Sequence, residues 1–344
     1  MKGEREVRKP GLDTSSAWLY QYLPHFKVRP NFESQMPLHI ETPLIESRSI
    51  SRKVGQSIWL KMESAQPSGS FKARGIGYAC EEYLKRGAKR FIASSGGNAG
   101  LAVAFAGRRL SVPVIVIVPE TASKRAVNLM CLENAEVIVQ GKSLDEAHRF
   151  ALSLMQPDDA YIHPFDDPLI WRGHASLIDE IFRAGLKPDA IVLSVGGGGL
   201  LCGVIEGLRR NRGADVPVIA VETEGADSYG KSLKAGFLVE LANISSIATT
   251  LGARIVCEQA LAYSREHCIQ SVVLPDQAAV SASLQFLQDH GIVVEPACGV
   301  ALAAVYEKVA ALSEYKTVLV IVCGGVGSTA DHLVELARRE YDGI

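Results

Sequence analysis

One lysine of this chain lies where its amine could act as a nucleophile. Lys72 ends the stretch Ser68-Gly69-Ser70-Phe71-Lys72, which follows an apolar run predicted to be a strand, Ser57–Met62. Ser70 is a favourable N-cap residue, so Lys72 is predicted in the first turn of a helix over Phe71–Arg86. The positive end of a helix disfavours an ammonium group and shifts the amine towards its neutral form. A neutral lysine amine can form a Schiff base with an aldehyde, although most lysines are simply exposed.

Two turns could bind anions through their backbone amides. The first, Ser94-Ser95-Gly96-Gly97-Asn98-Ala99-Gly100, offers hydroxyl, amide and N–H groups before a predicted helix, which suits a carboxylate, although an ordinary tight loop would look the same. The second, Gly196-Gly197-Gly198-Gly199, is costly in chain entropy and leaves its amides bare for a phosphate at the start of the helix from Leu200. It lacks the GxGxxG spacing of dinucleotide-binding proteins. Glu222 lies about twenty residues on, so NAD binding is an alternative for this segment alone.

Two further segments carry weaker signals. Cys323-Gly324-Gly325 ends a predicted strand, Thr317–Val322, and could be no more than a buried thiol beside a turn. The segment 225–232 matches the GxxxxGK[ST] pattern of nucleotide-binding P-loops. Gly236 interrupts the segment that follows, and no predicted strand ends in the aspartate that would hold the metal. A P-loop is therefore the less favoured interpretation of residues 225–232.

The elements that would position these turns alternate along the chain. Several predicted strands, such as Val114–Val118, are continuous apolar runs typical of a parallel sheet covered on both faces. This alternation predicts an α/β fold with doubly wound parallel sheets, and seven to nine strands over this length indicate two sheets. Ligands bind at the carboxyl ends of such strands, where the four turns lie. The remaining predicted strands are Arg90–Ser94, Pro113–Val118, Glu136–Val139, Ala190–Val195 and Val216–Glu222, and the remaining helices are Ser15–Tyr22, Asn98–Leu110, Ser123–Asn134, Ser143–Met155, Leu169–Ala184, Leu200–Arg210, Asp276–Asp289, Gly299–Leu312 and Ser328–Arg339.

Composition excludes several classes of function. The 344 residues are 47% hydrophobic and 22% charged, which predicts one large or two medium globular domains. A net charge of −2 gives no electrostatic case for a nucleic-acid or membrane partner. No apolar run reaches the ~18 residues of a membrane span, and residues 1–10 have no apolar signal segment. Seven scattered cysteines without a CxxC pair favour a reducing compartment, the cytoplasm, over a disulfide framework or a zinc site.

A nucleophilic lysine, a phosphate loop and a carboxylate loop together indicate pyridoxal phosphate and an amino-acid substrate. From about residue 39 to 330 the chain resembles the serine/threonine dehydratase family of fold type II pyridoxal-phosphate enzymes, closest to the serine dehydratases. The resemblance implies a tryptophan synthase β-like architecture with an N-terminal arm (1–36), a large cofactor-binding domain (37–64 and 170–344) and a small domain (65–169). It also implies a homodimer. The motifs that carry it are Ser64–Lys72, Ser94–Gly100, Pro164–Pro168, Ser194–Leu201, Glu295–Gly299 and Cys323–Gly325.

The resemblance also implies roles for individual residues. Lys72 would be the Schiff-base lysine and general base, and Lys72 and Ser95 would be catalytic. Phe71 would pack beside the pyridine ring, and Asn98 would bond the ring 3′-oxygen. Cys323 would face the pyridine nitrogen, and Gly324 would also bind the cofactor. The remaining implied contacts are, to the substrate, Ser95, Gly96, Gly97 and Asn98; to the phosphate, Gly196, Gly197, Gly198, Gly199 and Leu200; and to a monovalent cation such as K⁺, Glu222, Ser228, Ala226, Leu251 and Ala253.

The activity implied is β-elimination of L-serine, with some L-threonine, giving pyruvate or 2-oxobutyrate and ammonia. Other reactions of this fold type, serine racemase and threonine synthase, are alternatives, as are a P-loop nucleotide binder and an inactive amino-acid sensor. Gly96 stands where some relatives carry alanine. Val326-Gly327-Ser328 follows the Cys323 turn, where many relatives place an asparagine. Both departures bear on substrate choice.

Overall fold

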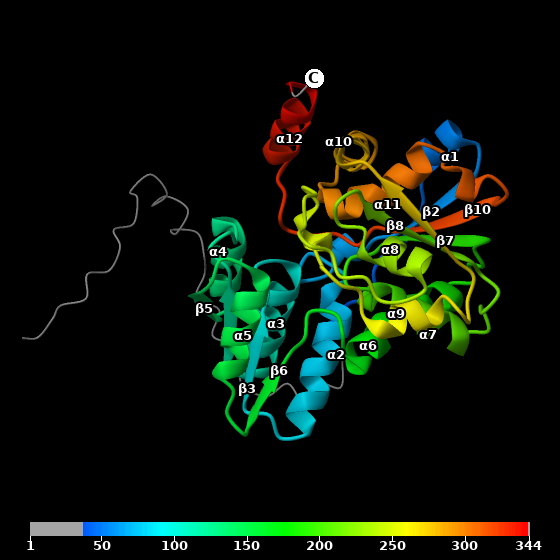
Figure 1. Cartoon of the computed structure of the whole chain (residues 1–344). Coiled ribbons are helices and arrows are strands. Elements are labelled where there is room, and N and C mark those ends of the chain that lie inside the picture. Colours follow the sequence, from blue (N-terminus) through cyan, green and yellow to red (C-terminus); the bar gives the residue numbers. More distant parts are fainter. Residues whose placement is uncertain (1–36, 343–344) are drawn as a thin grey trace, which may run out of the picture. The chain divides into compact units, whose positions relative to one another are not determined.

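Ten strands form two sheets within residues 37–342, the part of the chain described by this computed structural model (Figure 1). The larger sheet has six strands in the order β1-β2-β10-β7-β8-β9, and the smaller has four in the order β5-β4-β3-β6. All neighbouring strands are parallel except β1, which pairs antiparallel with β2. The strands are β1 Leu44–Glu46, β2 Ser57–Lys61, β3 Arg90–Ser94, β4 Val114–Val118, β5 Glu136–Val139, β6 Asp159–Tyr161, β7 Ala190–Ser194, β8 Val218–Thr223, β9 Ile269–Leu274 and β10 Thr317–Ile321.

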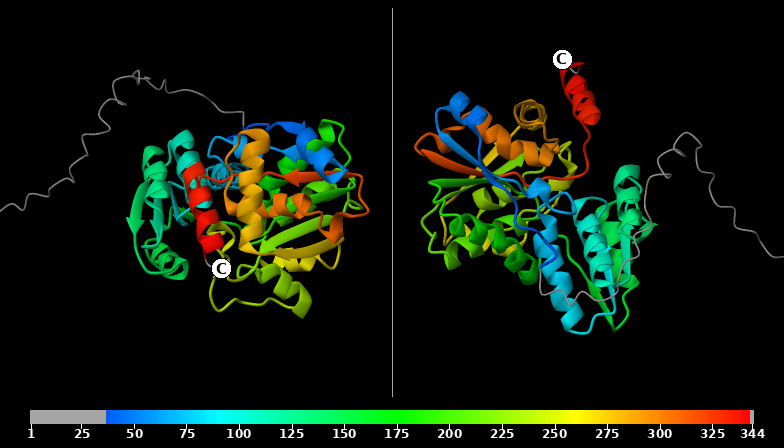
Figure 2. Two further views of the ribbon diagram at one scale, coloured as in Figure 1. Left: turned by 90° about the horizontal axis from the view of Figure 1, so that it is seen from above. Right: turned by 180° about the vertical axis from the view of Figure 1, so that it is seen from behind.

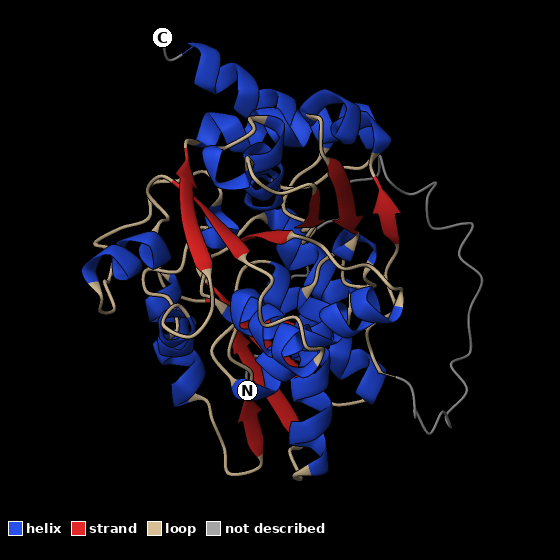
Figure 3. Ribbon diagram, turned by 90° about the vertical axis from the view of Figure 1, so that its right-hand side faces the viewer, coloured by secondary structure: helices blue, strands red, loops and turns tan. Residues whose placement is uncertain are grey.

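Helices cover the sheets, as Figure 3 shows by colour. Helix α2 packs against α3 and also against α6, so it runs between the elements of the two sheets (Figure 1). Helix α11 is apolar all round and is buried against β7 and β8, while α10 and α12 lie beside one another (Figure 2). The helices are α1 Arg48–Val54, α2 Lys72–Lys85, α3 Asn98–Leu110, α4 Lys124–Leu132, α5 Leu144–Ser153, α6 Pro168–Arg183, α7 Gly199–Arg210, α8 Ser228–Ala235, α9 Glu258–Tyr263, α10 Asp276–His290, α11 Pro296–Tyr306 and α12 Ala330–Asp342.

The predicted α/β class and the two parallel sheets are confirmed, and α3 has the predicted bounds. Strands β1, β6 and β9 were not predicted. The first two are only three residues long, and all three lie at sheet edges, where the apolar pattern is weak. Helices α1, α8 and α9, of six to eight residues, were also missed.

The two sheets relate simply to the predicted domains. The strands of the larger sheet come from residues 44–61 and 190–321, and those of the smaller sheet from residues 90–161. Residues from Pro37 onward form one compact unit, so the division at 65 and 169 stays a prediction. The N-terminal arm and the helix expected at Ser15–Tyr22 lie outside the described residues. Within 37–342, no helix is both long and apolar enough to cross a bilayer.

Candidate active site

Lys72 is the first residue of α2, as predicted, but Ser70 does not cap the helix. The N-cap residue is Phe71, in the right-handed helical region, without a side-chain capping bond. Ser70 instead forms an isolated antiparallel bridge with Gly324. Its hydroxyl is buried and has no hydrogen-bond partner within the described part of the chain. The bridge, together with a bond from Phe71 N to Cys323 O (3.0 Å), joins the start of α2 to the turn after β10.

The amine of Lys72 is set apart from carboxylates. Its Nζ donates a hydrogen bond to the carbonyl of Pro164 (2.5 Å) and lies 5.1 Å from the ring centroid of Phe71. Lys72 forms no ion pair with any residue in the range 37–342. Burial lowers the pKa of Lys72 to about 8, although the Cys323 thiol nearby opposes the shift. This burial adds to the effect of the helix end, and it makes the amine a much better nucleophile at neutral pH than an exposed lysine.

A turn between β6 and α6 supplies the carbonyl that holds this amine. His163 Nδ1 accepts hydrogen bonds from the backbone N–H groups of Phe165 (3.2 Å) and Asp166 (2.7 Å). Burial lowers the pKa of His163 to about 4, so the ring is neutral and Nδ1 is free to accept. Asp167 then caps α6 by accepting from Leu169 N. The turn therefore aims Pro164 O at Lys72 and places the Phe165 ring against the glycine loop.

The loop of four glycines has no room for side chains. A Cβ at Gly197 would lie 2.2 Å from the Phe165 ring, and one at Gly199 would lie 2.7 Å from the Phe165 carbonyl. Gly198 has φ +91°, which favours glycine, and is the N-cap of α7. The helix begins at Gly199, one residue before the prediction. Bare amides at the start of a twelve-residue helix form a site suited to a phosphate group.

The first glycine-rich turn leads directly into α3. Gly97 is the N-cap of α3 and Asn98 its first residue, and Ser95 Oγ accepts from Gly97 N (3.4 Å). Asn98 Nδ2 donates to Glu295 Oε1 (2.7 Å), and its Oδ1 accepts from Val326 N (3.0 Å). Both ends of the amide are therefore held by residues distant in sequence. Glu295 opens one of the motifs that carry the family resemblance, but no individual role was predicted for it.

Cys323 lies two residues beyond the end of β10, near the amine of Lys72. The thiol is buried, and its Sγ is 3.5 Å from Ser194 Oγ at the end of β7. Gly324 and Gly325 follow with φ of +81° and +131°, and Gly325 N donates to Gly69 O (2.9 Å). The backbone thus brings the predicted Lys72, Cys323 and glycine segments to neighbouring strand ends, where each can contact one ligand.

The segment 225–232 is not built as a P-loop. Helix α8 starts at Ser228, in the middle of the motif. Its amides of Tyr229 and Gly230 donate to the buried carboxylate of Glu222 (2.9 and 2.7 Å). Lys231, the residue that would contact a phosphate, pairs with Asp227 (2.9 Å). The chain's own carboxylate therefore occupies the amides that a nucleotide would need.

One of the predicted cation ligands lacks a hydrogen-bond partner in the described part of the chain, and others already have one. Burial raises the pKa of Glu222 to about 8, and the buried Ser228 hydroxyl has no partner among residues 37–342. The carbonyl of Leu251 lies near Gly196 but already accepts from Ala253 N (2.7 Å). Within the described residues, no group of three or more histidine, cysteine, aspartate and glutamate side chains could hold a metal ion.

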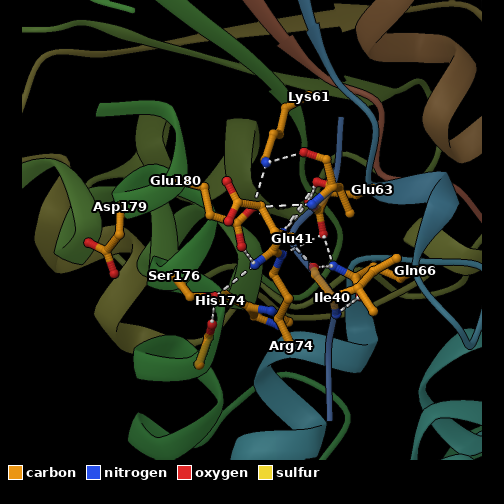
Figure 4. A network of polar contacts seen from close by, with 12 residues as sticks. Ile40, Glu41, Lys61, Glu63, Gln66, Arg74, His174, Ser176, Asp179 and Glu180 are labelled. Atoms are coloured by element: carbon orange, nitrogen blue, oxygen red, sulfur yellow. Dashed lines mark hydrogen bonds and ion pairs between the residues drawn. The ribbon is translucent and has the colours of Figure 1, made fainter. Parts of the chain in front are cut away.

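A buried ion network that the sequence did not reveal anchors α2 just beyond Lys72 (Figure 4). Arg74 is fully buried and holds Glu63 through two bonds (2.7 and 2.8 Å) and Glu180 through two more (2.6 and 2.7 Å). Lys61 donates to Glu180 (2.5 Å), which balances the two carboxylates with two cations. The network ties the first turn of α2 to α6 and to the end of β2.

Comparison with known proteins identifies the class. Residues 36–324 match the family described as pyridoxal-phosphate dependent enzyme, and the chain belongs to that family. It is 49% identical over 303 residues to the mouse L-serine dehydratase/L-threonine deaminase, covering 85% of this chain and 93% of the mouse protein. It is 41% identical over 329 residues to the L-serine dehydratase of Dictyostelium discoideum, covering 90% and 94% of the two chains. The structure of a fungal L-serine ammonia-lyase from Rhizomucor miehei matches with a TM-score of 0.85 and 34% identity, over 89% of this chain and all of the fungal one.

The residues present fit the cofactor of this family. A lysine amine with a pKa of about 8 suits an aldehyde. Phe165 leaves no room for side chains at Gly197 and Gly199, so the backbone N–H groups at the start of α7 are what this loop can offer a phosphate. The class of the site thus agrees with the family that the chain belongs to.

Proposed function

We propose that this chain is a pyridoxal-phosphate-dependent L-serine ammonia-lyase that also accepts L-threonine, giving pyruvate or 2-oxobutyrate and ammonia. The observation that carries the proposal is the Lys72 amine, held away from carboxylates and beside the Cys323 turn. The names of the mouse and Dictyostelium relatives supply the reaction and substrates.

The chain's own residues would divide the work as follows. Lys72 would hold the cofactor and then take the α-proton of serine, since its pKa of about 8 suits a base at neutral pH. Amides from Gly196 to Leu200 would hold the phosphate, and those of Ser95 to Asn98 the substrate carboxylate. Phe71 would lie beside the pyridine ring, and the Cys323 thiol would face its nitrogen. Once bound, pyridoxal phosphate supplies an electron sink for the pair left by the α-proton.

Three further features belong to the proposal. A monovalent cation such as K⁺ would be bound by Glu222, Ser228 and the carbonyls of Ala226, Leu251 and Ala253. The cation would compensate the buried carboxyl group of Glu222 and the Ser228 hydroxyl, which has no partner within the described residues. A homodimer and a cytoplasmic location are proposed from the family resemblance and from the cysteine pattern.

The test is a visible spectrum of the purified protein before and after borohydride, with mass mapping of the reduced lysine. A yellow band before reduction, and a cofactor attached to Lys72 after it, support the cofactor role. Both should be absent in Lys72→Ala and present in the matched surface variant Lys231→Ala. Pyruvate release from L-serine then supports the lyase, whereas D-serine as the main product would assign a racemase. A protein that stays colourless with added cofactor would refute the proposal.

A further inference from the structure

One buried carboxyl beside the site is not explained by the mechanism. Glu295 immediately precedes α11 and is only 4% exposed. Its Oε1 accepts from Asn98 Nδ2 (2.7 Å) and from Thr250 Oγ1 (2.6 Å), and its Oε2 accepts from Gly327 N (3.3 Å). Within residues 37–342 it forms no ion pair. Its contacts are therefore those of a hydrogen-bond acceptor rather than of a counter-ion.

The three partners come from three different segments of the site. Asn98 starts α3 beside the predicted carboxylate loop. The Thr250 methyl lies 3.5 Å from where a Cβ on Gly97 would be, so this residue touches the same loop. Gly327 follows the turn that begins at Cys323. One carboxyl group thus joins three residues that are 77 to 229 positions apart in the sequence, as given by 327 − 250 and 327 − 98.

The chain around Glu295 is shaped to admit the carboxyl. A Cβ at Gly325 would lie 2.0 Å from the Glu295 carboxyl carbon, and Gly325 has φ +131°. Only glycine meets both demands, so the backbone packs directly on the carboxyl. The orientation of the Asn98 amide follows from its neighbours, because Val326 N can only donate and Glu295 Oε1 accepts from Nδ2. One of the two N–H bonds of Nδ2 remains for a ligand.

We propose that Glu295 is a positioning residue that fixes the Asn98 amide with one N–H directed at the 3′-oxygen of the cofactor. The inference rests on the proposed function, since Asn98 has this partner only if pyridoxal phosphate binds. Glu295 acts through Asn98 and Thr250 and does not itself contact the reacting atoms.

The test compares three variants by titrating their apoproteins with pyridoxal phosphate. Glu295→Ala removes all acceptors, and we expect at least tenfold weaker binding and a shifted visible band. Glu295→Gln keeps an amide oxygen for Asn98 and Thr250, and we expect affinity within threefold of wild type and an unshifted band. Asp276→Ala is the matched control, because Asp276 holds Ser246 (2.5 Å) and Ile247 (2.9 Å) but not Asn98; it should bind the cofactor as wild type does.

A double-variant cycle tests the route through the amide. Adding Glu295→Ala to Asn98→Ala should cost less than threefold more affinity, because the group that Glu295 positions is already gone. If Glu295→Ala does not fold, Glu295→Asp, which withdraws the carboxyl by one methylene, replaces it with the same expectation. Three results would overturn the inference. The Glu295→Ala variant could bind the cofactor with wild-type affinity and an unshifted band, or Glu295→Gln could lose as much affinity as Glu295→Ala. The losses of affinity in Asn98→Ala and Glu295→Ala could also add fully in the double variant. Failure of the wild-type protein to bind the cofactor would instead overturn the proposed function.

Discussion

Capture of pyridoxal phosphate by the apoprotein should accelerate with pH only up to about pH 8. Only the neutral amine attacks an aldehyde, and burial lowers the pKa of Lys72 to about 8. At pH 7 such an amine is about 9% neutral, whereas a lysine of pKa 10.5 is about 0.03% neutral, a difference of roughly 300-fold. The capture rate should therefore rise about tenfold per pH unit below pH 8 and level off above it.

Stopped-flow absorbance between pH 6 and 10 measures this rate, and Lys72→Arg, which cannot form the Schiff base, is the blank. Because the Lys72 Nζ lies 5.1 Å from the Phe71 ring, Phe71→Ala should admit water to the amine. The pH at which the capture rate levels off should then rise from about 8 towards 10. A wild-type rate that still climbs tenfold per unit through pH 10 would show that the amine is not desolvated. If the rate in Phe71→Ala levels off at the same pH as in the wild type, the Phe71 ring does not contribute to the lowered pKa of Lys72.

Three other predictions concern the glycine loop, the buried ion network and the proposed cation site. Gly197→Ala should weaken cofactor binding at least tenfold in a spectroscopic titration, because its Cβ would lie 2.2 Å from the Phe165 ring; adding Phe165→Ala should recover part of the loss. Arg74→Met leaves Glu63 and Glu180 facing only one cation, so urea denaturation should show about 3–5 kcal/mol less stability, with Arg183→Met, an exposed pair, near wild type. Exchanging K⁺ for tetramethylammonium should slow pyruvate release several-fold and reversibly; unchanged turnover would argue against the cation site.

The parts of the site that could be predicted from the sequence are those in which a short segment determines its own structure. Four consecutive glycines after an apolar strand specify a loop with bare amides wherever the segment folds, and α3 begins at Asn98 as the pattern indicated. Lys72 lies in the first turn of α2, as predicted, but the capping role of Ser70 on which the prediction rested is wrong. Ser70 does not cap α2, because its backbone pairs with Gly324, and a tertiary contact has replaced the local capping preference.

The parts that could not be predicted depend on residues distant in sequence. Arg74 looks like an ordinary helix residue until Glu63 and Glu180 surround it, and nothing near Glu295 in the sequence indicates that it holds an amide 197 residues away. The motif around Glu295 was visible, but its function depends on α3 and the turn after Cys323 meeting at one point. Periodicity and capping rules describe single elements, so they cannot identify such meeting points.

The segment 225–232 shows why a phosphate-binding pattern needs its backbone before it implies a ligand. A P-loop binds phosphate because a run of amides is left unpaired. Here Glu222, the last residue but one of β8, accepts from the amides of Tyr229 and Gly230, so the anion site is already filled from within the chain. Burial raises the pKa of Glu222 to about 8, so this carboxyl is largely neutral at pH 7 and would carry a charge there only if a bound cation compensated its burial. The P-loop interpretation therefore fails because the backbone amides it needs are already paired, and a monovalent cation at Glu222 is a part of the proposed function.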